Sequence, residues 1–250
     1  MTSPGETIGI LHSILRYYAV PFRLRRLTRF YAQFICPGDL CFDVGAHVGS
    51  RLRVWSRLGA FSLAVEPQPG CLRFLHRWYG RHPNIILVEC ALGSTEGEQT
   101  LLVSRRTPTL ATLSTQWIEA VRQAPSFAGV RWDASIRVKV RTLDSLIRQY
   151  GEPAFCKIDV EGYELEVLKG LSQPLPCLSF EYIPAATWLS TGCIQRLEVL
   201  GVYEFNYTVG EAAYLSLEKW TSGERMAAWL ETLKPDDPSG DIYARRIPAR

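Results

Sequence analysis

An acid and two glycines stand close together in the segment CFDVGAHVGS, residues 41–50. Asp43 comes near the end of a short apolar run, and Gly45 and Gly49 follow it. Glycine lets a backbone turn sharply and come close to a ligand. A dinucleotide site would need the pattern G-x-G-x-x-G, which places pyrophosphate at a helix N-terminus, whereas a carboxylate at this turn repels phosphate and suits an ammonium group. The segment therefore favours a ligand with a cationic group, and a purely structural strand-to-helix turn is the alternative.

A second carboxylate, Glu66, lies at the end of the next apolar run, 23 residues after Asp43. At this place in an α/β sheet, a carboxylate can accept hydrogen bonds from both hydroxyls of a ribose. A ligand that joins a ribose to a cationic amino-acid portion and carries no phosphate is S-adenosylmethionine. The two carboxylates and the glycine turn together therefore predict a site for this cofactor.

Carboxylates also stand at the ends of two later apolar runs. Asp159 and Glu161 lie in KIDVEG, and Glu181 lies in LSFEY. Methyl transfer to a hydroxyl needs an aligned acceptor that loses its proton, and a nearby carboxylate can take that proton. We therefore predict Asp159 as a catalytic residue, with Glu181 as a second candidate. The alternative is structural: Lys157 pairs with Asp159, because the two share a face of an extended strand, and Glu161 caps the next helix.

Two of these carboxylates could also share a divalent ion, because magnesium prefers oxygen ligands. Asp159 and Glu181 would be the ligands, and no further residue completes the set. We therefore predict no metal site, and metal-assisted transfer is the less favoured alternative. The seven cysteines show no C-x-x-C spacing, which argues against a zinc site or a disulfide framework and favours a reducing cytoplasm.

Strand-like and helix-like runs alternate along the chain and must position these residues. Strands are expected at residues 40–44, 61–66, 84–90, 135–140, 154–160 and 177–182, and helices at 50–58, 70–79, 142–150 and 163–171. Such alternation predicts a mainly parallel sheet with helices on both faces, whose ligands lie at the carboxyl ends of the strands. We expect one methyltransferase-sized domain over residues 38–250, preceded by a helical N-terminal attachment over 1–37.

Residues 98–135 break the alternation and are interpreted as an insertion. Its segment 105–120 is rich in threonine and serine and contains Trp117. Long irregular connections in compact domains often form lids or binding loops, and hydroxyl groups with an aromatic ring suit a sugar-like or polyketide-like acceptor. A hairpin that only covers a sheet edge is the equal alternative.

A basic run without any acid lies between residues 16 and 29. Its arginines are Arg16, Arg23, Arg25, Arg26 and Arg29. Apolar residues recur at helical spacing in and after this run, which predicts an amphipathic helix with its basic face in water. An anionic partner, either a membrane surface or an acidic substrate, is the alternative. Nucleic acid is not expected, because the net charge is only +3 and no recognition motif accompanies the run.

The sequence resembles the FkbM family of S-adenosylmethionine-dependent methyltransferases over roughly residues 38–246. The matching segments, in the family's order, are CFDVGAHVGS, AVEPQPGCLRFL, NIILVECALGS, RTLDSLI and KIDVEGYELEVLKGL. LSFEY and GDIYAR are similar to members of the same group. The resemblance implies a class I methyltransferase (Rossmann-like) fold: a seven-stranded, mostly parallel sheet with its last strand antiparallel and helices on both faces.

The resemblance also implies roles for individual residues. Asp43, Gly45 and Gly49 would hold the methionine end of the cofactor, and Glu66 the ribose hydroxyls. Cys90 and Ala91 would form part of the adenine wall. His47 stands where many members carry asparagine, which adds it as a third catalytic candidate beside the cofactor loop.

The implied activity is methyl transfer, usually to an oxygen, on a small-molecule, glycan or natural-product acceptor. The sequence does not identify that acceptor or predict an oligomeric state. One alternative function is a catalytically inactive cofactor-binding or scaffold protein of the same fold. The other is a nicotinamide-dependent oxidoreductase, against which the missing G-x-G-x-x-G pattern and the acid at Asp43 argue.

Overall fold

The computed structural model of the protein describes residues 9–11, 14–15, 18, 20 and 22–247. Arg16 of the basic run, and part of the expected N-terminal attachment, lie outside the described residues. None of the helices in the described part of the chain is both long and apolar enough to cross a membrane.

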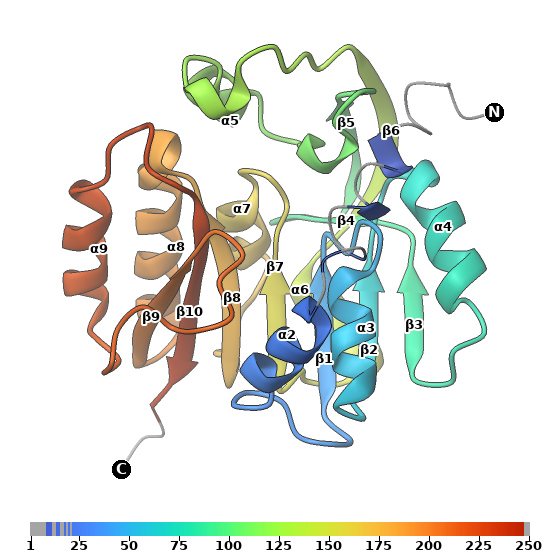
Figure 1. The fold of residues 1–250 in the computed structure, drawn as a ribbon, viewed down its shortest axis with the longest axis horizontal. Coiled ribbons are helices and arrows are strands. Elements are labelled where there is room, and N and C mark those ends of the chain that lie inside the picture. The colour runs from blue at the N-terminus through green and yellow to red at the C-terminus, as the bar shows by residue number, and fades with distance from the viewer. Residues whose placement is uncertain (1–8, 12–13, 16–17, 19, 21, 248–250) are drawn as a thin grey trace.

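A seven-stranded sheet forms the centre of the molecule (Figure 1). Its spatial order is β3 (Ile85–Val88), β2 (Phe61–Val65), β1 (Leu40–Val44), β7 (Phe155–Ile158), β8 (Cys177–Tyr182), β10 (Gly240–Arg246) and β9 (Tyr203–Val209). The strands from β3 to β8 pair in parallel, and β10 is antiparallel to both of its neighbours. This topology confirms the expected class I methyltransferase fold.

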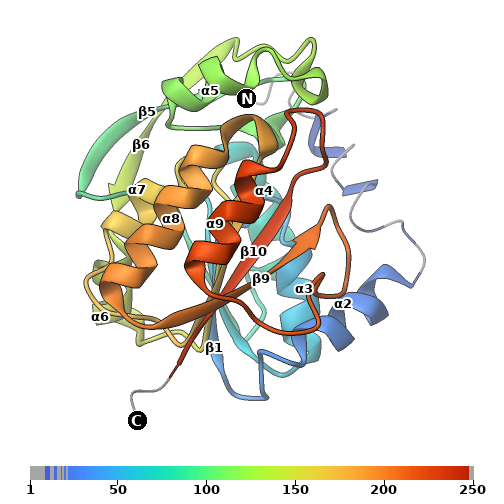
Figure 2. The same ribbon diagram turned by 90° about the vertical axis from the view of Figure 1, so that its left-hand side faces the viewer.

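Helices cover both faces of this sheet (Figures 1 and 2). One face carries α6 (Leu143–Tyr150), α7 (Glu164–Lys169), α8 (Thr187–Leu200) and α9 (Gly223–Glu231), and the other carries α2 (Arg23–Tyr31), α3 (Ser50–Arg57) and α4 (Pro69–Tyr79). In β1, Phe42 and Val44 join the core on the first face and Cys41 the core on the second. Because side chains alternate along a strand, Asp43 lies on the face of α2 and α3.

The described part of the expected N-terminal attachment shares a core with the rest of the chain. Leu27, Phe30 and Tyr31 of α2 are buried, and the Tyr31 ring makes edge contacts with Trp55 and Phe155. Burial of these rings stabilises the helix on the sheet far more than its own propensity does. The boundary between residues 37 and 38 stays a prediction.

A small second sheet stands beyond the carboxyl end of the main one, in the order β4 (Ala91–Leu92), β6 (Ala134–Arg141), β5 (Gly97–Val103). Between β5 and β6 lie η1 (Pro108–Leu110), α5 (Thr115–Val121) and η2 (Pro125–Phe127). The strand expected at 135–140 forms, but placing it among the parallel βα units of the main sheet was wrong, because it pairs antiparallel with β5. Its first residues alternate between exposed and partly buried, as on an outer ribbon. The limits of the insertion at 98–135 stay a prediction.

Candidate functional site

The glycine turn after β1 joins the ends of three strands. Gly45 has φ 87°, and a Cβ atom there would lie 1.9 Å from the carbonyl oxygen of Asp159. The Gly45 amide donates a hydrogen bond to the carbonyl oxygen of Val65 at the end of β2. Gly49, with φ 74°, lies directly before α3. Only glycine permits both the positive φ and the close approach at position 45.

Glu66 follows β2 and is 2% exposed. One carboxylate oxygen accepts a hydrogen bond from the His47 amide, and the other accepts one from the Gln68 amide, both at 2.8 Å. Burial raises the pKa of Glu66 to about 7, although the two amides act in the opposite direction. The carboxylate lines a cavity together with Cys90 and Ala91. Glu66, Cys90 and Ala91, which are expected from the sequence to contact one ligand, therefore border one cavity.

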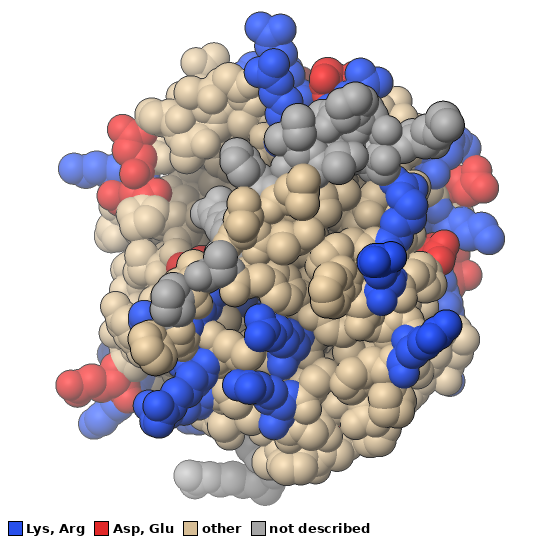
Figure 3. All heavy atoms as spheres, turned by 45° about the vertical axis from the view of Figure 1, so that its right-hand side comes forward, with Lys and Arg blue, Asp and Glu red and all other residues tan. Residues whose placement is uncertain are grey.

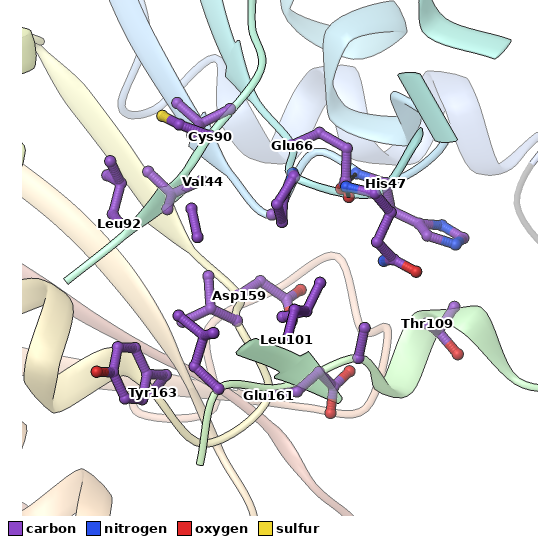
Figure 4. A pocket seen from close by; sticks show the side chains of 18 residues that line it. Val44, His47, Glu66, Cys90, Leu92, Leu101, Thr109, Asp159, Glu161 and Tyr163 are labelled. Carbon is purple, nitrogen blue, oxygen red and sulfur yellow. Dashed lines mark hydrogen bonds between the residues drawn. The ribbon is translucent and has the colours of Figure 1, made fainter. Parts of the chain in front are cut away.

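Most of the walls of this cavity are apolar, and we call it the cofactor cavity (Figure 4). Glu66 and His47 lie toward one end, and Cys90 and Leu92 toward the other. The second sheet and its loop supply further lining residues, which are Leu101, Thr109, Ala111 and Leu113. The sequence predicted a lid or binding loop in this region as one of two equal alternatives. It did not identify these four residues, because neither their types nor their spacing shows which cavity they line.

Asp43 lies one residue before the end of β1 and is 2% exposed. Its Oδ2 atom has no hydrogen-bond partner among the described residues. Burial raises the pKa of Asp43 to about 7, against the opposing charges of Arg51 and Lys157. The residue lines a second, polar cavity that it shares with Gly45 and both of these cations.

These residues fit S-adenosylmethionine. The buried oxygen of Asp43 without a partner would accept a hydrogen bond from the ammonium group of the ligand. Glu66 would take the ribose hydroxyls, and the apolar wall at Cys90 and Ala91 would take the adenine ring. Buried polar atoms are normally hydrogen-bonded. A hydrogen bond from the ligand would give the buried oxygen of Asp43 the partner that it lacks among the described residues.

Asp159 follows β7 and meets a buried lysine. The ammonium group of Lys157 lies 3.2 Å from Oδ2 of Asp159 and 2.7 Å from Oδ1 of Asp241. Burial lowers the pKa of Lys157, but the two carboxylates outweigh it and hold the pKa well above its usual value. The ion pair of the structural alternative is therefore present. The side chain of Asp159 is nevertheless 35% exposed, and it lines the cofactor cavity as well.

A larger cavity of about 600 Å³ lies next to Asp159, and we call it the acceptor cavity. Asp159, Glu161 and Glu181 line it from the strand ends. Residues of the insertion also border it, among them Thr109, Ser126 and Phe127, together with the loop 235–239 before β10. Both Asp159 and Glu161 border the cofactor cavity too, so the two cavities meet at these carboxylates.

Three carboxylates meet where the two cavities join, although only Asp159 and Glu181 were expected to form a pair. Oxygens of Asp159, Glu161 and Glu181 all lie within 4.8 Å of one another. Burial, and then the neighbouring carboxylates, raise the pKa values of Glu161 and Glu181. Such a group can be neutralised by protons or by a divalent cation. The absence of a metal site stays a prediction, now with a third candidate ligand.

The interpretation of Glu161 as a helix cap was wrong. The N-cap of α7 is Tyr163, and Glu164 in the first turn accepts hydrogen bonds at Oε1 from the amides of Val160 and Gly162, which precede the helix, at 3.0 and 3.3 Å. Glu161 has φ 54° and lines both cavities. The two-residue spacing from Asp159 was the signal that could have assigned it to the site.

His47 lies in the glycine turn and borders the cofactor cavity. Burial lowers the pKa of His47 to about 4, while the charge of Asp159 acts in the opposite direction. The imidazole is therefore neutral at pH 7 but a weak base. Of the three catalytic candidates, Asp159 and Glu181 border the acceptor cavity, and His47 does not line it.

The chain is similar in sequence to known methyltransferases. The family model described as methyltransferase FkbM domain matches residues 43–189. Methyltransferase sdnD of Sordaria araneosa is 28% identical over 225 aligned residues, covering 74% of this chain and 83% of that protein. Hexuronic acid methyltransferase AglP of Haloferax volcanii is 27% identical over 145 residues, covering 57% of this chain and 54% of that protein. Among solved structures, precorrin-6y C5,15-methyltransferase of Geobacter metallireducens has a TM-score of 0.45 at 15% identity, over 90% of this chain and 86% of the other.

Proposed function

The chain belongs to the FkbM methyltransferase family, whose model matches more than half of its length, and we propose that it is an O-methyltransferase. In this proposal, the methyl group of S-adenosylmethionine is transferred to a hydroxyl oxygen of a small-molecule, glycan or natural-product acceptor. The observation that carries the proposal is the position of Asp159, whose side chain lines both the cofactor cavity and the acceptor cavity.

Binding of the cofactor would depend on three features of the chain. Glu66 accepts from the ribose hydroxyls, Asp43 holds the ammonium group, and the wall at Cys90 covers the adenine ring. Gly45 and Gly49 shape the turn beside the methionine portion. When bound, S-adenosylmethionine supplies a methyl group on a cationic sulfur, which leaves as the neutral thioether.

The reaction at the acceptor needs alignment and removal of one proton. The acceptor oxygen forms the new bond to carbon, the carbon–sulfur bond breaks, and the hydroxyl proton passes to the carboxylate of Asp159. Lys157 lies 3.2 Å from this carboxylate and holds it in position. Alignment supplies much of the rate enhancement, and proton removal by a placed base typically adds about 100- to 10,000-fold. Glu181 is the second candidate for this role.

The lining of the acceptor cavity supports a hydroxyl-rich acceptor. Thr109 and Ser126 contribute hydroxyl groups, and Phe127 contributes an aromatic face. The name of one relative, hexuronic acid methyltransferase AglP, specifies a sugar acid as the substrate of that protein. We propose an acceptor of this general kind, handled in the cytoplasm, with no nucleic-acid substrate.

Calorimetric titration with S-adenosylhomocysteine and, separately, with NAD tests the cofactor class without knowledge of the acceptor. We expect binding of the first and none of the second. Transfer of a labelled methyl group into fractionated cell extract then tests activity. Cofactor binding without any transfer would instead support the inactive protein of the same fold, and NAD binding would support an oxidoreductase.

Replacing Glu66 by alanine tests the ribose assignment. We expect the variant to bind S-adenosylhomocysteine more weakly by about 1.5–3 kcal/mol, the range for hydrogen bonds to a charged group. The measurement is calorimetry, with the unfolding midpoint recorded in parallel. Glu89 is exposed and borders none of the three cavities described above, so Glu89→Ala is the matched control and should bind as the natural sequence does. Equal affinities of the two variants would exclude the assignment.

A further inference from the structure

The helices on one face of the main sheet expose a row of arginines, which we call the basic face. Its members are Arg25, Arg26 and Arg29 of α2, Arg53 and Arg57 of α3, and Arg73 and Arg77 of α4. Figure 3 shows this side of the molecule, with basic side chains spread over it and acidic ones mainly at the margin. The three helices pack next to one another, α2 and α4 on either side of α3. The arginines therefore form one surface and not three separate sites.

Acidic residues are scarce in the part of the sequence that forms this face. Between residues 9 and 84 the only acids are Asp39, Asp43 and Glu66. Asp43 and Glu66 are buried, and Asp39 accepts a hydrogen bond from the amide of Cys36. Within the described part of the chain, no ion pair involves the arginines of α2 that are exposed. The charges of Arg25, Arg26 and Arg29 are therefore left for solvent or for a partner.

Large apolar side chains are also exposed on or next to these helices. Phe22, directly before α2, is 78% exposed, and Trp78 of α4 is 67% exposed. The N-terminal segment adds the exposed side chains Leu11, Leu15 and Val20. Leaving so much apolar surface in water is unfavourable, and grouped patches of this kind mark interaction sites.

Contacts between distant segments join the apolar residues to the basic face. The Tyr18 ring makes an edge contact with Phe74, which packs against Trp78 at 5.9 Å. The Tyr18 hydroxyl lies 2.7 Å from that of Tyr79, and the Arg53 guanidinium lies over the Tyr18 ring. Tyr18 is thus held between α3 and α4, and Val20 borders a small cavity together with Arg23 and Arg53.

We propose that the basic face docks on an anionic lipid bilayer. Arginines attract the phosphate and carboxylate groups of the lipids, and exposed aromatic and aliphatic side chains enter the headgroup region, which is the combination found in interfacial helices. Each arginine near an anionic bilayer contributes about a fivefold gain in partitioning. An exposed aliphatic side chain such as Val20, which borders one cavity with Arg53, gains nothing from a nucleic acid, so the surface favours lipid over RNA. From the sequence alone we expect a solvated face; the arginines of α3 and α4 and the exposed rings were not part of that expectation.

Flotation with lipid vesicles tests the proposal on the full chain. We expect binding to phosphatidylcholine vesicles containing about one third phosphatidylserine, weak binding to pure phosphatidylcholine, and release at high salt. The variant Arg25→Gln/Arg26→Gln/Arg29→Gln should lose about 100-fold in partitioning. A second variant, Phe22→Asn/Trp78→Gln, should keep the salt-sensitive attraction but lose the binding that persists at moderate salt. Asparagine is chosen because Phe22 has φ 60° and asparagine accepts such a conformation.

A matched control removes the same charge elsewhere. Arg122 at the end of α5, Arg148 on α6 and Arg225 on α9 are exposed and lie away from the basic face. Their triple change to glutamine should leave flotation unchanged, and all variants should bind S-adenosylhomocysteine like the natural sequence, which shows that they fold. Equal losses in the two triple variants, no dependence on anionic lipid, or tight binding to a single-stranded RNA without flotation would each overturn the proposal.

Discussion

The Asp159→Asn variant is expected to lower turnover on a hydroxyl acceptor by about 100- to 10,000-fold, the usual contribution of general-base assistance. Asparagine keeps the shape and most of the hydrogen bonding of the side chain but removes its charge and basicity. Cofactor affinity should change far less, because Asp159 lies at the junction with the acceptor cavity. The measurement is the initial rate of labelled-methyl transfer, once an acceptor has been found, together with calorimetry for S-adenosylhomocysteine.

The ion pair with Lys157 provides the control for this variant. Asp241 is the other carboxylate bound to Lys157, at 2.7 Å, so Asp241→Asn removes the same kind of partner from the lysine. If Asp159 were only structural, both variants would lower the melting temperature and leave the rate per folded molecule nearly intact. A fully active Asp159→Asn protein would exclude it as the base and leave Glu181 and His47.

Protonation of Asp43 is expected to lower the affinity for S-adenosylhomocysteine about tenfold for each pH unit below 7, and so about 100-fold by pH 5. In the protein without ligand, burial raises the pKa of Asp43 to about 7. Below that pH the side chain is protonated and neutral, whereas the ammonium group of the ligand needs the carboxylate. Affinity therefore increases with pH up to about 7 and levels off above it. Calorimetry at several pH values between 5 and 8 measures this dependence.

The Asp43→Asn variant separates this effect from that of Glu66, whose pKa is also about 7. The variant should bind more weakly at pH 8 and show a flatter pH dependence, with only the contribution of Glu66 left. Because burial disfavours the charged form of Asp43, the neutral amide should not lower the unfolding midpoint at pH 8. An unchanged slope in the variant would rule out Asp43 as the ammonium ligand.

Local features of the chain were predictable from the sequence. The strand at residues 40–44 is observed as β1 with the same limits, and the helix expected at 50–58 is observed as α3. Apolar periodicity and the glycine positions depend on neighbouring residues only, so they can be read without knowledge of the fold. Asp43 and Glu66 followed from the same patterns, because the carboxyl ends of parallel strands must meet at one edge.

Contacts between distant segments were decided only by the tertiary structure. Glu161 and Glu164 are two acids of one short run, yet the first lines the cavities and the second binds the backbone amides of Val160 and Gly162. Leu101 and Leu113 of the insertion line the cofactor cavity. The basic face combines arginines of three helices. The sequence determined the family, the central fold and the positions of Asp43 and Glu66 at the strand ends, since these depend on local pattern. Packing between segments that are far apart in the sequence decided three further features, because such packing depends on the shape of the whole core. They are the position of Glu161 beside the other two carboxylates, the cover of the cofactor cavity, and the arginines that share the basic face.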